Sequence, residues 1–264
     1  MSPPTIVLIT GANRGIGRGL LELYLSKPNH TVVAANRDPD HPTSKEILAL
    51  PRATGTTVKL VKVDMASETD AADAAEILKT RDGIDHIDIL IANAGIAYSW
   101  PKLEDVMIQD IRTHFETNVL GFVRVYQAFM SVLKRSNDPK LVTIGSSAAF
   151  LTVLSVFRPT PKGVVLSCRN TINFPNAAYA PTKLVQHWYT KTVAVMEPWL
   201  TAFPVDPGFV QTDMGNRGAA LLGIGKATIT IEESVRGVLS VVDASTKDTH
   251  SGKLWKWTGE EEPW

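Results

Sequence analysis

Tyr179 and Lys183 are four residues apart, a spacing that places both side chains on one face of a helix. A tyrosine hydroxyl ordinarily ionises near about pH 10, and a neighbouring ammonium group favours the ionised form. Such a tyrosine can give a proton to a carbonyl oxygen as hydride reaches the carbon, and recover it through the lysine and solvent. The hydroxyl of Ser147 can hold the same oxygen. A Tyr/Lys pair alone is more often an ordinary surface pair, so the interpretation needs independent support.

A glycine-rich turn near the N-terminus gives that support. The run Thr10-Gly-Ala-Asn-Arg-Gly-Ile-Gly17 follows the apolar residues 6–9, where a buried strand would lead into a helix. Gly11 permits a tight turn, Gly15 lets the backbone approach phosphates, and Gly17 lets the helix pack on the sheet. The unpaired N–H groups and positive dipole end of the helix favour an anion. The turn therefore predicts a dinucleotide-binding site.

The end of the second expected strand indicates which dinucleotide binds. Arg37 stands there and no acidic residue precedes it, while Arg14 lies inside the glycine turn. An acid at this place binds the ribose 2′-hydroxyl of NAD, whereas a guanidinium accommodates a 2′-phosphate. This favours NADPH/NADP+ over NADH, unless Arg37 instead pairs with Asp38 or Asp40. Asp64 is expected near the adenine, with a helix-capping role as the alternative.

Short apolar runs alternate with helical patterns along most of the chain. Buried strands joined by helices predict a Rossmann-type, doubly wound parallel sheet of about seven strands, with helices on both faces. We find no linker or internal repeat, so residues 1–264 are expected to form a single domain. The expected strands are 5–10, 31–35, 58–63, 87–92, 141–145, 201–205 and 253–257. The expected helices are 15–26, 67–80, 104–135, 182–197 and 230–244, with a further helical region at 43–50.

Composition limits the classes of partner. Lys plus Arg equals Asp plus Glu at 27 each, so no net field favours nucleic acid or an anionic membrane. The single cysteine, Cys168, excludes an intrachain disulfide, and the six histidines lack metal-ligand spacing. Neither a signal sequence nor an apolar run of about 20 residues is present. We expect a cytoplasmic protein that binds neither metal, nucleic acid nor membrane.

Taken together, these features resemble the short-chain dehydrogenase/reductase family over nearly the whole chain. The further matches are Asn93-Ala-Gly95, Asn118, Ser146-Ser147, and Pro207-Gly208 with Thr212. The resemblance implies that Ser147, Tyr179 and Lys183 are catalytic, and that Asn118 supports a proton-relay water. Lys183 would also hydrogen-bond to the nicotinamide ribose. The residues expected to contact the cofactor are Gly11, Asn13, Arg14, Gly15, Ile16, Gly17, Arg37, Asp64, Met65, Asn93, Ala94, Gly95, Tyr179, Lys183, Pro207, Gly208, Val210 and Thr212.

The chain end, including residues 201–215 and 259–264, also resembles fungal norsolorinic acid ketoreductase-like enzymes, which act on ketones of aromatic polyketides. We therefore expect an NADPH-dependent ketoreductase of secondary metabolism with a bulky, aromatic polyketide-type carbonyl substrate. Aromatic and apolar residues would rim its pocket. Two alternatives stay open: an imine reductase or cyclase of a fungal alkaloid pathway, and a catalytically inactive NADPH-binding sensor or scaffold. Helices 104–135 and 182–197 could pair across a two-fold axis, giving a homodimer or homotetramer. The expected rim residues are Tyr98, Trp100, Phe150, Phe209, Met214, Leu221 and Leu222.

Two features depart from the family pattern. Between Ser147 and Tyr179 lie 31 residues, many more than the family usually has, and the surplus falls within 150–176. This insert is interpreted as a lid over the substrate, a neutral surface loop, or a gene-model artefact from an unspliced intron. Pro181 is tolerated only in the first turn of a helix, so the helix that carries Lys183 should begin no earlier than about Ala178.

Overall fold

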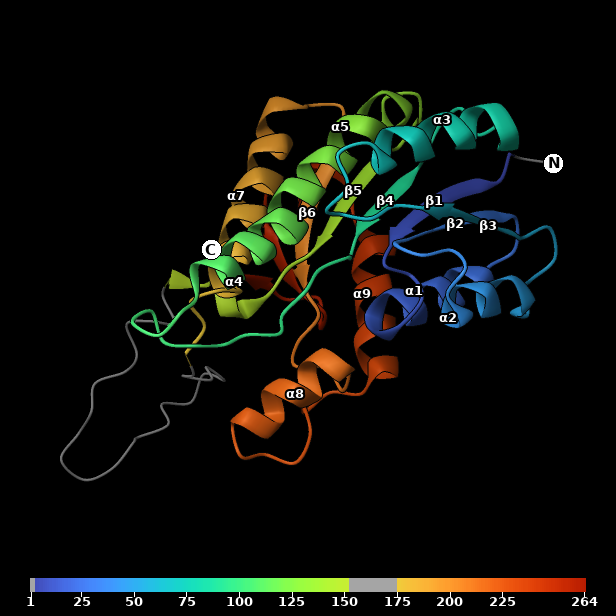
Figure 1. Ribbon diagram of the computed structural model, residues 1–264. Coiled ribbons are helices and arrows are strands. Elements are labelled where there is room, and N and C mark those ends of the chain that lie inside the picture. Colours follow the sequence, from blue (N-terminus) through green and yellow to red (C-terminus); the bar gives the residue numbers. More distant parts are fainter. Residues whose placement is uncertain (1–2, 152–174) are drawn as a thin grey trace.

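The computed structural model describes residues 3–151 and 175–264 (Figure 1). An eight-stranded sheet forms its centre, in the order β3-β2-β1-β4-β5-β6-β7-β8. All pairings are parallel except that of β7 with β8. Because the order reverses beside β1, the sheet is doubly wound, which confirms the predicted α/β class. The strands are β1 (Thr5–Thr10), β2 (His30–Asn36), β3 (Thr57–Lys62), β4 (Ile89–Ala92), β5 (Lys140–Ile144), β6 (Thr201–Asp206), β7 (Leu254–Lys256) and β8 (Glu261–Glu262).

Helices cover both faces of the sheet. In Figure 1, α1, α2 and α9 lie on one face, and α3, α5 and α7 lie on the other. The central strands are buried on both sides, which explains their continuous apolar character; Val7, Leu8 and Ile9 have no exposed surface. The helices are α1 (Gly15–Leu25), α2 (Pro42–Lys45), α3 (Asp70–Asp82), α4 (Ile108–Phe115), α5 (Gly121–Leu133), α7 (Ala180–Met196), α8 (Asp213–Leu221), α9 (Ile231–Ala244) and α10 (Lys247–His250).

Two helices begin where a capping side chain or a proline in the sequence predicts that they should begin. The spacing of Thr230 and Glu233 forms a capping box at the start of α9. Helix α7 begins at Ala180 and has Pro181 in its first turn, in agreement with the limit that the proline sets.

Three expectations were wrong in detail. The region 104–135 is not one helix, since a π-helical turn, Glu116–Leu120, separates α4 from α5. Helices α8 and α10 were not expected. The acidic run 260–262 was expected to be a solvated tail, but it contains β8, which pairs antiparallel to β7. Lys253 neutralises Glu261 across this pair, with their charged atoms 3.0 Å apart, so an acidic strand is stable there.

The predicted insert at 150–176 falls almost wholly on residues 152–174, which lie outside the described part of the chain. Within the described residues, no helix is long and apolar enough to cross a membrane.

Candidate active site

The glycine turn lies at the carboxyl end of β1 and has the geometry of a phosphate cradle. Gly11 has a φ of +65°, a conformation that favours glycine. A Cβ on Gly17 would stand 2.3 Å from the Gly11 oxygen and 2.5 Å from Asn93 Nδ2, so no larger residue fits at position 17. Arg14 caps α1 without any side-chain hydrogen bond, which leaves the N–H groups of its first turn available to an anion.

Polar side chains hold this turn in place. Asn93 Nδ2 donates to the carbonyl oxygens of Thr10 (2.9 Å) and Gly11 (3.2 Å). The backbone N–H groups of Asn93 and Ala94 both donate to Thr10 Oγ1 at 3.0 Å. Asn36 Oδ1 accepts the Ala12 N–H at 2.8 Å. Asn93 and Ala94 were expected at this turn from the sequence, whereas the supporting roles of Thr10 and Asn36 were not.

The two arginines expected at the cofactor lie at the surface beside the turn. Arg37 is exposed after β2, and neither carboxylate considered as its partner pairs with it within the described residues. Asp40 pairs with Lys45 at 2.9 Å, and Asp38 accepts the Asp40 N–H. Arg14 lies 3.9 Å from Asp213 in an exposed contact. Both guanidinium groups are therefore available to a phosphate.

Other expected cofactor residues surround the same edge. Asn13 Nδ2 donates to Thr43 Oγ1 at 2.8 Å. Ile16, in the first turn of α1, is partly buried and packs against the core. Asp64 Oδ1 accepts the Ala66 N–H at 3.0 Å, so this carboxylate stabilises its own turn; it does not cap the next helix, α3, whose N-cap is Thr69. Met65 follows as a buried side chain.

The segment after β6 lies against the glycine turn. Thr212 Cγ2 would be 3.3 Å from a Cβ on Gly15, and Thr212 Oγ1 caps α8 by accepting the Gly215 N–H. Val210 is buried and forms a bridge with Ile229. Pro207 and Gly208 lead into this segment, and the φ of Gly208 is +79°. The expected cofactor residues of three separate strands thus meet at one edge of the sheet.

Two adjacent serines, Ser146 and Ser147, follow β5 and lie close to the candidate catalytic tyrosine. Ser146 interacts with Tyr179 and acts to lower the pKa of the tyrosine, and Ser147 acts in the same way on the carboxyl of Asp206. Ser146 caps the short 3₁₀ turn Ser147–Ala149, with its Oγ accepting the Ala148 N–H at 3.2 Å. The catalytic role of Ser147 stays a prediction.

Burial sets the acidity of the tyrosine and the lysine. Burial, followed by the charge of Asp206, raises the pKa of Tyr179 to about 12. Burial lowers the pKa of Lys183 to about 8. Lys183 Nζ donates to the Ile144 oxygen (2.7 Å) and to Gln186 Oε1 (2.9 Å). The expectation that the ammonium of Lys183 lowers the pKa of Tyr179 is thus not met: desolvation dominates.

Asn118 lies in the π-helical turn and is almost completely buried. Its Oδ1 accepts the Ile96 N–H at 2.8 Å, and its Nδ2 donates to the Ile96 oxygen and to Thr182 Oγ1. The side chain thus joins the loop after β4 to α7. A Cβ on Gly95 would lie 3.2 Å from Asn118 Oδ1 and 3.9 Å from Lys183 Nζ, which places these three residues together.

Two further residues hold the serine pair and were missed. His187 Nε2 accepts the Ser146 N–H at 3.3 Å, and burial lowers the pKa of this imidazole to about 3. His187 follows Lys183 by four residues on the same helix face, a signal that the sequence contained. Asp206 is only 4% exposed and directly precedes Pro207.

The expected pocket rim is placed in part. Tyr98 is half-exposed and donates to Asp110 Oδ1 at 3.2 Å, while Phe150 is buried. Arg217 of α8 donates to the Ala97 oxygen at 3.4 Å, which ties α8 to the loop that carries Tyr98. Leu221, at the end of α8, is exposed.

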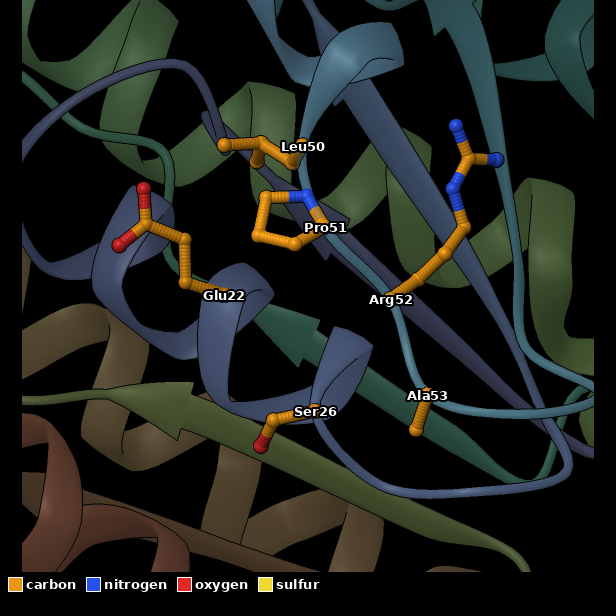
Figure 2. Close-up of a pocket in the computed structure, with 6 residues that line it drawn as sticks. All are labelled: Glu22, Ser26, Leu50, Pro51, Arg52 and Ala53. Atoms are coloured by element: carbon orange, nitrogen blue, oxygen red, sulfur yellow. The ribbon is translucent and has the colours of Figure 1, made fainter.

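A separate hollow of about 530 Å³ lies between the end of α1 and the 50–53 segment that leads into β3 (Figure 2). It borders the amino end of β3, whereas ligands of doubly wound sheets bind at the carboxyl ends of strands. Its acidic side chain, Glu22, already pairs with Arg18 at 2.6 Å. This hollow therefore offers no reactive group.

Comparison with known proteins identifies the family. The model of the short chain dehydrogenase family matches residues 5–157, more than half of the chain. The chain belongs to this family. It is 35% identical to a norsolorinic acid ketoreductase of Aspergillus parasiticus over 99% of this chain and 93% of the relative. It is 34% identical to a norsolorinic acid ketoreductase of Dothistroma septosporum over 100% of this chain and 94% of that relative.

Solved structures support the fold of this short-chain dehydrogenase. An NADPH-bound carbonyl reductase from chicken fatty liver superposes with a TM-score of 0.79, 24% identity and full coverage of both chains. The carbonyl reductase Sniffer of Drosophila melanogaster gives the same TM-score with 19% identity and full coverage of both chains. These two structures support the fold, and membership of the short chain dehydrogenase family makes the protein an oxidoreductase with a nicotinamide cofactor.

Proposed function

We propose that this chain is an NADPH-dependent ketoreductase that reduces a carbonyl of a bulky, aromatic polyketide-type substrate in secondary metabolism. The position of Tyr179 at the start of α7 carries the proposal: Lys183, four residues on, donates to the Ile144 oxygen at 2.7 Å, which brings the tyrosine beside the serine pair that follows β5, where one carbonyl oxygen can contact both kinds of hydroxyl. The relatives named norsolorinic acid ketoreductase support the substrate class.

The surroundings of the glycine turn support NADPH. The close approach at Gly17 and the uncapped start of α1 fit a pyrophosphate. Arg37 and Arg14 lie beside the turn, where either guanidinium can hold a 2′-phosphate by paired hydrogen bonds. No acidic side chain occupies the end of β2, where an NAD-specific site has one.

Each catalytic side chain has its own role in the proposed reduction. When bound, the nicotinamide supplies hydride to the carbonyl carbon. Ser147 donates a hydrogen bond to the carbonyl oxygen, and Tyr179 gives its proton to the same oxygen as negative charge develops there. The raised pKa of Tyr179 keeps this hydroxyl protonated at neutral pH, which is the state that an acid needs. Lys183, whose pKa of about 8 allows proton exchange near neutrality, returns a proton to Tyr179.

The proposal is tested by following NADPH oxidation with a panel of aromatic polyketide ketones and cyclic imines, using the parent protein and Tyr179→Phe. We expect the ketones to be reduced by the parent, and the variant to bind NADPH normally while losing turnover by about 100-fold or more. Oxidation of NADPH by imines alone would favour the imine reductase. Tight NADPH binding with no turnover of any ketone would favour the inactive binding protein.

A further inference from the structure

Gln186 of α7 contacts the candidate catalytic lysine, although the proposed proton transfer does not use it. Its side-chain Oε1 accepts a hydrogen bond from Lys183 Nζ at 2.9 Å, and the same Nζ donates to the Ile144 oxygen at 2.7 Å. Gln186 follows Lys183 by three residues, so one helix face carries both side chains. Both residues are almost completely buried, Gln186 at 1% and Lys183 at 4% exposed. The amide oxygen of Gln186 therefore belongs to the immediate surroundings of the ammonium.

These two acceptors fix the ammonium at the carboxyl end of β5. An ammonium group has three N–H donors and no acceptor. Among the described residues, Ile144 and Gln186 take two of the donors of Lys183, so one remains for the cofactor ribose or for proton return to Tyr179. A Cβ on Gly95 would lie 3.9 Å from Lys183 Nζ, so the ammonium also lies against the loop that follows β4. Losing one acceptor would give the long lysine side chain other rotamers and displace the remaining donor.

Neither acceptor of the lysine carries a charge. A backbone carbonyl and a neutral amide hold the ammonium in place, whereas a carboxylate would also stabilise its charge. In the part of the chain that the structure describes, no carboxylate pairs with Lys183, and burial lowers the pKa of this lysine to about 8. Lys183 can therefore release a proton near neutral pH while its nitrogen keeps its position.

We propose that Gln186 is a positioning residue of the reductase site: its uncharged amide oxygen holds the Lys183 ammonium at the end of β5 and leaves the proton of that ammonium free to move to Tyr179. This inference rests on the proposed function. In the proton-return step, one N–H bond of Lys183 breaks as the O–H bond of Tyr179 re-forms, and solvent then returns a proton to the lysine. Gln186 acts only through Lys183, because an amide neither gives nor takes a proton at these pH values.

The other titratable groups around this end of α7 determine how a pH profile of the reduction is interpreted. Burial and the charge of Lys183 lower the pKa of His187 to about 3, and burial raises that of Tyr179 to about 12. Burial also raises the pKa of Glu262 to about 7, so its titration belongs to the acid side of the profile. The alkaline decline of the reduction should therefore follow the loss of the Lys183 proton. The groups considered are Tyr179 and His187 of α7, Asp206 of β6, Lys256 of β7 and Glu262 of β8.

The experiment compares Gln186→Glu and Gln186→Leu with the parent in ketone reduction, from about pH 6 to about pH 10. Glutamate keeps the length and the acceptor oxygen but adds a charge, so Lys183 should keep its proton to higher pH, and the alkaline decline should move up by about 1 pH unit or more. Leucine removes the acceptor, so kcat near neutral pH should fall by about 10-fold, with a smaller change in the KM of the ketone, and the decline should begin at lower pH.

The directions of the two shifts distinguish positioning of the lysine from a structural role. Shifts of the alkaline decline in opposite directions support the proposal, because a loss of packing alone would lower activity without moving the decline. Gln109→Glu, at an exposed glutamine of α4, is the matched control and should leave the profile unchanged. A parent-like profile in both Gln186 variants, or a shift of both in the same direction, would overturn the proposal.

Two further measurements keep the inference separate from folding and from the proposed function. If Gln186→Leu does not fold, Gln186→Glu alone decides, because an unchanged alkaline decline would contradict the role of the amide oxygen. If the parent binds NADPH but reduces no ketone, the proposed function fails, and crystal structures of the parent and Gln186→Leu with NADPH test the inference without turnover. A Lys183 Nζ that leaves the Ile144 oxygen in the variant supports the positioning role, and one that keeps its place refutes it.

Discussion

Lys183 Nζ, near the start of α7, donates to the oxygen of Ile144, the last residue of β5, at 2.7 Å. The parallel sheet makes this possible, because the carboxyl end of β5 and the first turn of α7 lie at the same edge as the glycine turn. The bond holds the start of α7, with Tyr179, beside Ser146 and Ser147, which follow β5. The chemistry of the site therefore depends on which of these two adjacent serines hydrogen-bonds to the carbonyl oxygen.

Exchanging the two serines for alanine should have very different effects. Ser147→Ala removes the hydrogen bond to the developing oxyanion and should lower kcat by about 100-fold or more. Ser146→Ala should lower it by less than about 10-fold, because the Ser146 hydroxyl caps the turn Ser147–Ala149. Steady-state kinetics with one ketone check this pair. A larger loss for Ser146→Ala than for Ser147→Ala would assign the catalytic role to Ser146.

Gly17→Ala should disrupt the cofactor site. The added Cβ would overlap the Gly11 oxygen and Asn93 Nδ2, so the turn must open. We expect NADPH to bind about 100-fold or more weakly, as measured by the quenching of protein fluorescence. Gly225→Ala is the matched control, since nothing lies within 4 Å of its Cβ position, and it should bind NADPH like the parent. Normal NADPH binding by Gly17→Ala would contradict the cradle.

Arg37→Ala should reduce the preference for NADPH over NADH. The substitution removes a guanidinium from the end of β2 and should raise the KM for NADPH by about 10-fold, with little change for NADH. Arg52→Ala removes an exposed arginine that precedes β3, bound to the Leu48 oxygen, and should change neither value. Equal changes in the KM values for NADPH and NADH in Arg37→Ala would show that this residue does not bind the 2′-phosphate.

His187 should make the protein sensitive to acid. Burial lowers the pKa of its imidazole to about 3, whereas the unfolded chain binds a proton below about pH 6.5. The unfolded state therefore gains protons first as pH falls, and the parent should lose about 2 kcal/mol of unfolding free energy between about pH 7 and about pH 5 through this residue. Urea unfolding at both pH values, with His187→Gln alongside, measures the difference. An equal loss in both proteins would mean that His187 is not held neutral.

Helix α7 should contribute to self-association. This helix exposes several large apolar side chains, among them Leu184, Trp188 and Val195, and Trp188 is 71% exposed. The predicted pairing of the helical regions 104–135 and 182–197 would cover such residues. We expect Trp188→Glu to shift a homodimer or homotetramer toward monomer in light scattering, whereas Leu48→Glu, at an exposed site elsewhere, should not. A parent protein that is monomeric at all concentrations would refute the pairing.

The order of strands and helices was predictable because each element has a strong local signal. Apolar runs mark the buried strands, and Pro181 limits the start of α7. The π-helical turn around Asn118 has no such signal, so one long helix was expected where α4 and α5 stand. Strand β8 was missed because its acidic residues indicate solvent, and only the pairing with β7 supplies Lys253 as a partner.

The candidate site, too, could be predicted only as far as local sequence patterns indicate it. Glycine spacing and the Tyr179-x-x-x-Lys183 pattern indicate the edge of the sheet and the class of chemistry. His187, which accepts the Ser146 N–H, and Asp206, which lies beside the serine pair, are distant from it in sequence, so local pattern does not reveal these neighbours. The raised pKa of Tyr179 likewise follows from burial in the folded chain, whereas the sequence shows only the nearby lysine.

Hydride transfer to a carbonyl is the central claim, and isotope transfer tests it most directly. The protein is incubated with an aromatic polyketide ketone and NADPH that carries deuterium at the transferable position of the nicotinamide, and the product is examined by mass spectrometry. We predict a deuterated alcohol with the parent and about 100-fold less of it with Tyr179→Phe in the same time, although both bind NADPH. Tight NADPH binding by the parent without deuterium in any alcohol product would contradict the ketoreductase.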